Sequence, residues 1–300
     1  MRWFAYNGDA DGICSMVQWA LEHGLDGELV TGVKRDIELL DRVKATKGDE
    51  LIAMDISLAR NHSLAKELIG KGVKITWIDH HLAGEEIPGL ISHIDTSKEV
   101  CTAIIVDGLL DGKHRGWAIA AAYGDGLHES ANRLAQGFDE KLAELGELLN
   151  YNSYGSLVND LHFHPNDLFA ACLNSITPEN FMQSEEFSKL QSGFAADIAK
   201  AESLSHREGQ LVRLPCEPWA RRVVGVFAHR LKEASPDHPH VIALDRGDGS
   251  WQISIRANEG VGEFCQRFGG GGRATAGGID VLSEDDMAAL MSAVYARWLD

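Results

Sequence analysis

Long apolar runs are absent from this sequence of 300 residues, and no stretch approaches the roughly 18 consecutive apolar residues that a transmembrane helix needs. The segment from Met1 to Phe4 runs directly into a predicted strand and shows no signal-peptide pattern, so we expect a cytoplasmic location and no membrane partner. Cysteines are few, odd in number, widely spaced and never arranged as C-x-x-C: Cys14, Cys101, Cys172, Cys216 and Cys265. We therefore expect reduced thiols rather than a disulfide framework or a thiolate zinc site.

Basic residues are also scarce, with 28 Lys and Arg against 45 Asp and Glu and a formal net charge of −17. Residues 1–208 hold 18 basic and 33 acidic residues, whereas residues 209–300 hold 10 and 12, and nine of those ten cations are Arg. Non-specific binding of long nucleic acid depends on neutralising phosphates, so we expect no such partner. Bound divalent cations would offset part of the charge, and the arginines suit bidentate contacts with phosphate.

Two common nucleotide-binding motifs are missing as well. The sequence contains no GxxxxGK[ST] loop, and no GxGxxG follows the first predicted strand. A different glycine-rich stretch, Gly269–Gly278, would let a ligand approach the backbone closely. Its simpler interpretation is the flexible end of a hairpin.

Polar side chains stand at the ends of three apolar runs in the first 81 residues. Residues 2–6 lead into Asn7-Gly8-Asp9-Ala10-Asp11-Gly12, residues 51–54 lead into Asp55, and residues 75–78 lead into Asp79-His80-His81. In open α/β sheets, ligands bind at the carboxyl ends of the strands. The three endings therefore predict one shared site.

Strand and helix patterns alternate around these motifs. We predict strands at 2–6, 28–33, 50–54, 73–79 and 90–95, and helices over 13–22, 37–45, 60–70 and 100–110. This alternation indicates a doubly wound, mainly parallel α/β sheet. Residues 116–123 are small and apolar, which predicts a buried strand that ends near Asp125, and residues 127–182 have a mostly helical pattern.

A change in composition predicts a second domain. Residues 184–208 are polar and helix-prone, and we interpret them as a helical connector between a domain at 1–183 and a smaller α/β domain at 209–300, with a cleft between the two domains. In the smaller domain we predict strands at 222–227, 240–244 and 251–256, a hairpin at 245–250 and a closing helix over 286–299.

Simpler interpretations exist for each acidic motif. The loop after the first strand matches the opening of an EF-hand, but a strand precedes it and Gln18 stands where the twelfth-position Glu should be. It could also be an Asx-rich turn, and Asp79-His80-His81 a solvated strand end. Their grouping favours a metal site, because carboxylates and imidazole without thiolate suit Mn²⁺ or Mg²⁺. Two such ions can activate water and support an in-line phosphoryl displacement.

The motifs, in their order, resemble those of the DHH phosphoesterase superfamily, and the glycine stretch with Ser254-Ile255-Arg256 resembles its DHH-associated C-terminal domain. The resemblance covers nearly the whole chain and is greatest to the nanoRNase and cyclic-nucleotide phosphodiesterase branch. It implies a Mn²⁺-dependent phosphodiesterase acting on short oligoribonucleotides or on linear or cyclic dinucleotides. A phosphoanhydride or phosphomonoester hydrolase of a small nucleotide or polyphosphate, and a non-catalytic nucleotide-binding module, are the alternatives. A homodimer is left open.

The resemblance also implies roles for individual residues. Two Mn²⁺ ions, or Mg²⁺ in their place, would be held by carboxylates and one imidazole: Asp9, Asp11, Asp55, His80 and Asp125. Asp55 would bridge the ions. Asp79 would orient His80, and His81 would face the phosphate, so His81 and Asp79 are the expected catalytic residues. Substrate would be bound by one strand residue and the glycine loop: Arg256, Gly270, Gly271, Gly272 and Arg273.

Two positions depart from the superfamily pattern. Asn7 stands where many members have His, so it would be a weak ligand to the first ion, or only a turn residue whose side chain bonds the following backbone. Arg273 stands where the glycine signature usually carries His. An arginine there could contact phosphate, but it could not transfer a proton.

Overall fold

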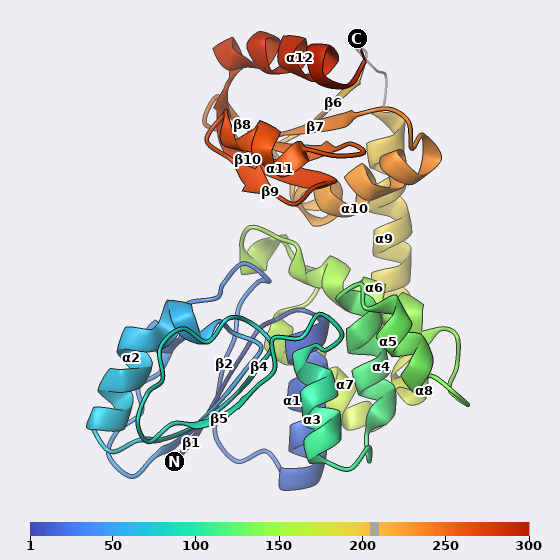
Figure 1. Cartoon of the computed structure of the whole chain (residues 1–300). Helices are drawn as coiled ribbons and strands as arrows, with labels where there is room; N and C mark the ends of the chain where they lie inside the picture. Colours follow the sequence, from blue (N-terminus) through green and yellow to red (C-terminus); the bar gives the residue numbers. More distant parts are fainter. Residues whose placement is uncertain (205–209, 300) are drawn as a thin grey trace. The chain divides into compact units, whose positions relative to one another are not determined.

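The computed structural model describes residues 1–204 and 210–299, and the chain divides into two compact units, Met1–Ser192 and Gly193–Asp300. Each unit contains its own five-stranded sheet (Figure 1). None of the described helices is both long and apolar enough to cross a membrane. The mixed α/β class with a second, smaller α/β unit is the class that the sequence predicts.

The sheet of unit 1 is entirely parallel. Its strands are β1 (Arg2–Tyr6), β2 (Glu28–Val30), β3 (Glu50–Met54), β4 (Lys74–Asp79) and β5 (Ile91–Ile94), in the order β2-β1-β3-β4-β5. Tyr6 pairs with Met54, and Met54 pairs with Ile78. The register therefore brings the residues that follow these three positions side by side at the carboxyl edge.

Helices cover both faces of this sheet, which gives the predicted doubly wound arrangement. α2 (Leu58–Gly70) and the 3-10 helix η1 (Leu39–Arg42) share a buried apolar cluster with Ile75 and Trp77 on one face. α1 (Ala10–His23) and α3 (Thr102–Leu109) contact β1, β3 and β4 but contribute nothing to that cluster, so they lie on the other face.

The rest of unit 1 is helical. It comprises α4 (Arg115–Gly124), α5 (His128–Leu134), α6 (Leu142–Ser153), η2 (Val158–Asp160), α7 (Pro165–Ser175), α8 (Pro178–Phe181) and the start of α9 (Glu185–Ser203). α4 packs against α1 and α6. Helix α9 lies within the segment predicted as a connector, whose residues 205–208 are outside the described residues.

Two predictions for unit 1 are wrong. Residues 116–123 form helix α4 rather than a strand, because the alanine-rich run favours helix and is buried on every side, which hides the helical period. Residues 37–45 contain only the short η1. Here the side chain of Asn61 accepts from the Leu40 N–H at 3.2 Å and donates to the Ile37 carbonyl at 2.7 Å, so it satisfies backbone groups that a helix would have paired.

Unit 2 carries a mixed sheet in the order β6-β7-β8-β10-β9, in which only β6 and β7 run parallel. Its strands are β6 (Leu211–Leu214), β7 (His240–Asp245), β8 (Ser250–Arg256), β9 (Gly271–Gly272) and β10 (Ala276–Ser283), and its further helices are α10 (Pro218–Ala234), α11 (Val261–Gln266) and α12 (Glu284–Trp298).

The strand predicted at 222–227 is part of α10, so that prediction is wrong too. Its run of valines resembles a strand, but the buried side chains recur at helical spacing, at Trp219, Val223, Phe227 and Leu231. Pro218 stands at the first helical position, where its missing N–H costs nothing.

Candidate metal centre

The first part of the site is the loop between β1 and α1. Asp9 is the N-cap of α1 and accepts from the Gly12 N–H at 3.1 Å. A Cβ at Gly12 would lie 2.1 Å from the Asn7 carbonyl oxygen, so only glycine permits this tight loop. The loop thereby holds Asp9 and Asp11 in buried positions at the carboxyl edge of the sheet.

Asp55 follows β3 directly and has a backbone φ of +55°. That left-handed conformation is strained for a residue other than glycine, and such strain gathers at functional sites. The Asp55 N–H donates to the Ile78 carbonyl at 3.1 Å, which fixes the turn against β4. Thr102 donates its hydroxyl to Asp55 Oδ1 at 3.2 Å, and the side chain is buried.

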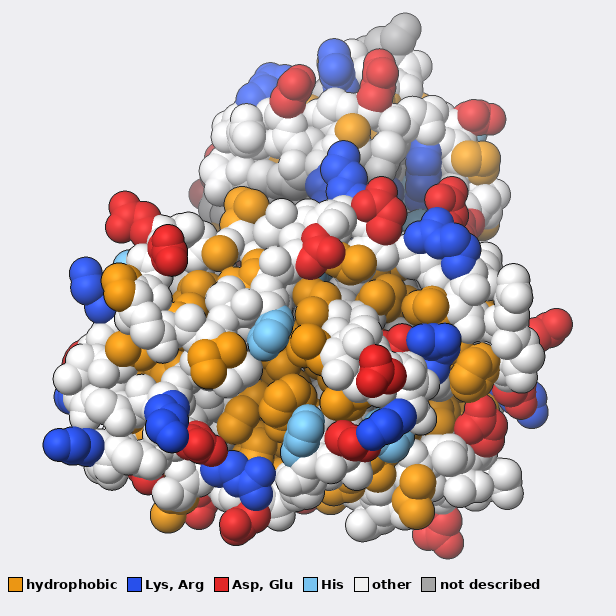
Figure 2. All heavy atoms as spheres, turned by 60° about the horizontal axis from the view of Figure 1, so that its bottom comes forward, with side chains coloured by type: hydrophobic (Ala, Val, Ile, Leu, Met, Phe, Trp, Pro, Cys, Tyr) orange, Lys and Arg blue, Asp and Glu red, His pale blue; other side chains and the backbone are white. Residues whose placement is uncertain are grey.

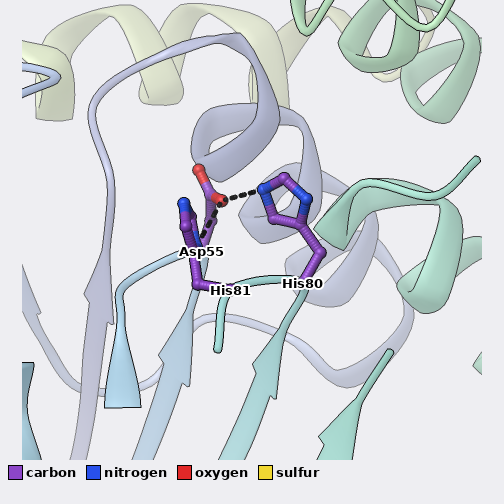
Figure 3. A group of neighbouring side chains, drawn as sticks. All are labelled: Asp55, His80 and His81. Atoms are coloured by element: carbon purple, nitrogen blue, oxygen red, sulfur yellow. Dashed lines mark ion pairs between the residues drawn. The ribbon is translucent and has the colours of Figure 1, made fainter. Parts of the chain in front are cut away.

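The two histidines stand just past β4, and both rings turn toward Asp55 (Figure 3). His80 Nε2 lies 3.5 Å from Asp55 Oδ1, 3.6 Å from Asp125 Oδ2 and 3.8 Å from Asp11 Oδ2. Cis ligands of an octahedral ion with bonds of about 2.1 Å stand about 3 Å apart, and trans ligands about 4.2 Å apart. These four side chains are of the types that suit a hard divalent ion, and the ligand atoms that lie within 4.8 Å of one another form two groups, one of Asp55, His80 and His81 and one that includes Asp11 and Asp125.

Asp79 contacts His81 rather than His80, contrary to the role that the resemblance implies. Its Oδ1 lies 2.7 Å from His81 Nδ1, and it accepts from the backbone N–H of His80 at 2.9 Å. The hydrogen bond to Asp79 raises the pKa of His81, although burial opposes the shift. The Asp79 side chain thus orients the ring of His81 and favours its protonated form, while the ring of His80 lies near the other carboxylates.

Asp11 lies in the first turn of one helix, α1, and Asp125 lies at the carboxyl end of another, α4. Both oxygens of Asp11 accept backbone N–H groups at the start of α3, from Thr102 at 2.8 Å and Ala103 at 2.7 Å. Asp125 follows α4 as its C-cap residue. The thiol of Cys101 completes this group, because its sulfur and one oxygen from each of these two aspartates lie within 4.8 Å of one another.

The electrostatics of this group favour a cation. Burial, followed by the charges of Asp11, Asp9 and Asp125, raises the pKa of Asp55 well above its usual value. Burial, followed by the charges of Asp11 and Asp9, raises the pKa of Asp125 to about 7. Both shifts report negative charge that the protein leaves uncompensated.

Asp9 differs from these carboxylates because Lys34, just past β2, donates to its Oδ2. Burial alone would raise the pKa of Asp9, but the charge and hydrogen bond of Lys34 outweigh it and lower that pKa. The same ammonium lies 3.7 Å from Asp125 Oδ1.

Asn7 has the contacts of a turn residue. Its amide oxygen accepts from the Asp9 N–H at 3.2 Å, and its amide nitrogen donates to the Lys34 carbonyl at 3.1 Å. These contacts match the second of the two roles that the sequence left open.

Sequence reasoning missed Lys34, Cys101 and Thr102. Lys34 follows the strand predicted at 28–33, so its place at the same sheet edge could have been noticed, but a single lysine after a strand forms no motif. Cys101 and Thr102 begin a helix far along the chain, and nothing in the sequence links them to the first loops.

Unit 1 contains hollows of different sizes. A hollow of about 190 Å³ beside the centre is lined by Lys34, Arg35, Ser153, Tyr154 and Gly155. A larger one, of about 310 Å³, involves the amino-terminal ends of strands and is lined by residues that include Arg2, Trp19, Glu50, Lys74 and Ile91. Figure 2 shows hydrophobic side chains gathered on a face of unit 1. None of the candidate metal ligands lines either hollow, and the smaller one is connected to the centre through Lys34.

The predicted substrate residues all lie in unit 2. Arg256 ends β8 and is partly buried, with its guanidinium donating to the Ser254 hydroxyl at 3.2 Å and to the Ile255 carbonyl at 3.0 Å. Arg273 is exposed and stands between β9 and β10, the strand that pairs with β8.

The glycine loop has a structural reason of its own. A Cβ at Gly270 would lie 2.1 Å from the Gly278 carbonyl oxygen, and one at Gly272 would lie 2.3 Å from the Ala276 carbonyl oxygen. Gly271, between them, has open space at its Cβ position. Close backbone approach inside the sheet therefore accounts for two of the three glycines without a ligand.

No protein-family model and no curated protein matches the sequence. Among solved structures, the manganese-bound exonuclease RecJ is 17% identical with a TM-score of 0.61, over 98% of this chain and 89% of that one. The pGpG-specific phosphodiesterase PggH from Vibrio cholerae is 13% identical with a TM-score of 0.55, over 99% and 98%. An exopolyphosphatase-related protein from Bacteroides fragilis is 14% identical with a TM-score of 0.53, over 99% and 92%. The chain therefore shares the fold of these solved structures.

Proposed function

We propose that the protein is a divalent-metal-dependent phosphoesterase, and more specifically a phosphodiesterase of short oligoribonucleotides or dinucleotides. The observation that carries this proposal is the convergence of three carboxylates, the buried Asp11 and Asp55 and the partly buried Asp125, on the imidazole of His80, within 3.5–3.8 Å. The likeness of the fold to that of RecJ and PggH, whose names denote an exonuclease and a phosphodiesterase, supports the same class.

Asp11, Asp55, His80 and Asp125 would hold the ion, since they supply the oxygen and nitrogen ligands that Mn²⁺ and Mg²⁺ accept. A bound ion would supply Lewis-acid polarisation of the phosphate and lower the pKa of water. The strained turn at Asp55 and the helix-capping contacts of Asp11 fix these ligands before any ion binds. Such preorganisation is what an effective charged site requires.

His81 would act on the phosphate as a proton donor. Asp79 holds its Nδ1, which leaves Nε2 on the opposite side of the ring to meet a phosphate or leaving-group oxygen. Because its pKa is raised, the ring carries its proton to higher pH than an ordinary histidine. The side chain is 43% exposed, so a substrate can reach it.

The hollow beside the centre favours a nucleotide substrate. A phosphoanhydride needs only cations around it, whereas a nucleotide also needs a surface for its base, and Tyr154 stands there with Lys34 and Arg35. Arg256 and Arg273 would bind a further phosphate of the substrate. The likeness to an exopolyphosphatase-related protein keeps phosphoanhydride hydrolysis as the second candidate.

The test is an assay of the purified protein with Mn²⁺ on RNAs of two to about five nucleotides, on RNAs of about 20 nucleotides, on linear and cyclic dinucleotides and on pyrophosphate. We expect cleavage of the short diesters and a rate per molecule that falls as the RNA lengthens, because outlying phosphates meet an acidic surface. Asp55→Asn is the control for contaminating nucleases. Cleavage of pyrophosphate alone would favour the second candidate, and no cleavage of any substrate would refute the proposal.

A further inference from the structure

We infer that Lys34 takes the place of the first of two cations, so that this centre loads one divalent ion rather than two. The inference rests on the proposed metal-dependent function and concerns how the charge of that site is supplied. It departs from the two-ion set that the motifs imply.

The contacts of Asp9 leave little for an ion. Its Oδ2 accepts from the ammonium of Lys34, and its Oδ1 accepts from the Gly12 N–H at 3.1 Å. The side chain is almost fully buried, with 4% of its surface exposed. A divalent ion at Asp9 would have to displace the ammonium from a place where that ammonium is already well bound.

Asn7 and Lys34 form one structural unit. The Asn7 amide donates to the Lys34 carbonyl at 3.1 Å, and the Lys34 N–H donates to the Ser153 carbonyl at 3.0 Å, so the backbone of Lys34 is held on both sides. An imidazole at position 7 that binds an ion, as in the resembling enzymes, uses its lone pair on that ion and could not also accept from the Asp9 N–H as the Asn7 amide does here. The change at position 7 and the lysine that it holds therefore support the same conclusion.

The other ligands belong to two compact groups, Asp55 with His80 and His81, and Asp11 with Cys101 and Asp125, and His80 Nε2 connects them. The two oxygens of Asp125 have different neighbours: Oδ1 lies 3.7 Å from the Lys34 ammonium, and Oδ2 lies 3.6 Å from His80 Nε2. Asp55 and Asp11 belong with His80, at 3.5 and 3.8 Å. One ion among these side chains and one ammonium at Asp9 neutralise most of the charge, and a second divalent ion would lie against a fixed positive charge.

Lys34 also reaches the space that a substrate would enter. Its side chain is 37% exposed and lines the hollow of about 190 Å³. The ammonium can therefore bind a substrate phosphate from the hollow side while it neutralises Asp9 from the other. Unlike a bound ion, the ammonium of Lys34 is part of the chain, so its positive charge does not exchange with ions in solution.

The experiment counts bound ions by calorimetry and by electron paramagnetic resonance of Mn²⁺. We expect the unmodified protein to bind one ion tightly and to show the hyperfine pattern of an isolated Mn²⁺. Asn7→His combined with Lys34→Met should bind two ions and show the broadened spectrum of a coupled pair. Arg35→Met removes a neighbouring cation from the same hollow and is the matched control, which should still bind one ion.

Two coupled ions in the unmodified protein would overturn the inference without any variant. A double variant that keeps its circular dichroism spectrum and still binds one ion would overturn it too. The outcome is separable from that of the proposed function. Turnover with two coupled ions would support the proposed function and refute the inference about Lys34. One isolated ion without cleavage of any phosphoester would support the inference and refute the proposed function.

Discussion

Asp9 and Asp55 are two carboxylates of one centre that are equally buried, with 3% and 2% of their surfaces exposed, yet their pKa values shift in opposite directions. Lys34 lies against Asp9 and lowers its pKa, whereas Asp55 has no lysine or arginine against it and lies beside other carboxylates, the Thr102 hydroxyl and two imidazoles. Both carboxylates are thus buried, and they differ because the Lys34 ammonium contacts Asp9 and not Asp55. In the proposed function, the side of Asp9 is neutralised by Lys34, and the side of Asp55 would be neutralised by an ion.

The largest expected effect comes from substituting these two residues in turn. Asp55→Asn should reduce turnover by more than about 100-fold, because even residues that only support metal ligands are worth about 10–100-fold. Without metal it should raise the melting temperature, since it removes one charge from a group of repelling carboxylates. Asp9→Asn should lower the melting temperature, because the Lys34 ammonium loses its nearest carboxylate and keeps only the more distant Asp125.

Thermal unfolding in chelator and steady-state kinetics in Mn²⁺ check both variants. Asparagine tolerates the left-handed backbone of position 55, so the exchange isolates the charge. Melting temperatures that move in the same direction for both variants would contradict the comparison.

A second prediction concerns phosphate binding by unit 2. Arg256→Ala and Arg273→Ala should each raise KM by about 10- to 100-fold, because a charge-assisted contact is worth about 1.5–3 kcal/mol. Mn²⁺ binding to unit 1 should be unchanged, which calorimetry measures. Arg246→Ala is the control, since this arginine lies in the β7–β8 hairpin and donates to the Asp280 carbonyl. Unchanged kinetics in both test variants would place the substrate elsewhere.

The third prediction is a pH dependence of stability in the metal-free protein. The folded state holds the Asp125 proton up to a pKa of about 7, whereas the unfolded chain loses it near pH 3.9, roughly. Folded protein therefore binds more protons in this interval, and the free energy of unfolding should fall by up to a few kcal/mol as the pH rises from about 4 to about 7. Asp9 acts oppositely, because its lowered pKa gives stability that is lost in acid.

Urea unfolding in chelator at about pH 5 and about pH 7.5 measures this slope. Asp125→Asn should lose much of it, and Mn²⁺ should reverse it because the ion binds the deprotonated carboxylates. An equal slope in the variant would show that other groups are responsible.

The smallest effect is expected for Asn7→His alone. The variant should still bind one ion while Lys34 remains, and should lose about 1 kcal/mol of stability with the two hydrogen bonds of the amide. Calorimetric titration with Mn²⁺ and urea unfolding give the two numbers. A second tight ion in this single variant would mean that an imidazole outcompetes the ammonium.

Local pattern was sufficient for the sheet and for most of the centre. Strand ends follow from apolar runs and their polar terminations, so Asp9, Asp11, Asp55 and His80 could be named before the fold was known. Asp125 was named although its element was misread, because a buried alanine-rich helix and a buried strand look alike in sequence. These residues are close together because parallel register aligns the strand ends.

What the sequence could not supply is the pairing of residues across elements. Whether Asp79 turns to His80 or His81 depends on how the chain leaves β4, and the contact of Lys34 with Asp9 depends on β2 lying beside β1. Both are tertiary outcomes to which neighbouring residues give no guide. The strand misassigned at 222–227 has the same origin, since burial on one helical face outweighed the preference of valine for strands.

Each carboxylate oxygen of Asp11 accepts a hydrogen bond from a backbone N–H of α3, so the start of that helix is coupled directly to the centre. An ion that draws on Asp11 acts directly on the bonds that keep the first turn of α3 closed. Hydrogen exchange of the Thr102 and Ala103 amides should therefore change with ion occupancy, while amides in the middle of β3 stay protected. Opening of this single helical turn would expose Asp11 to solvent, which gives the buried ion a route out of the protein that leaves the sheet intact.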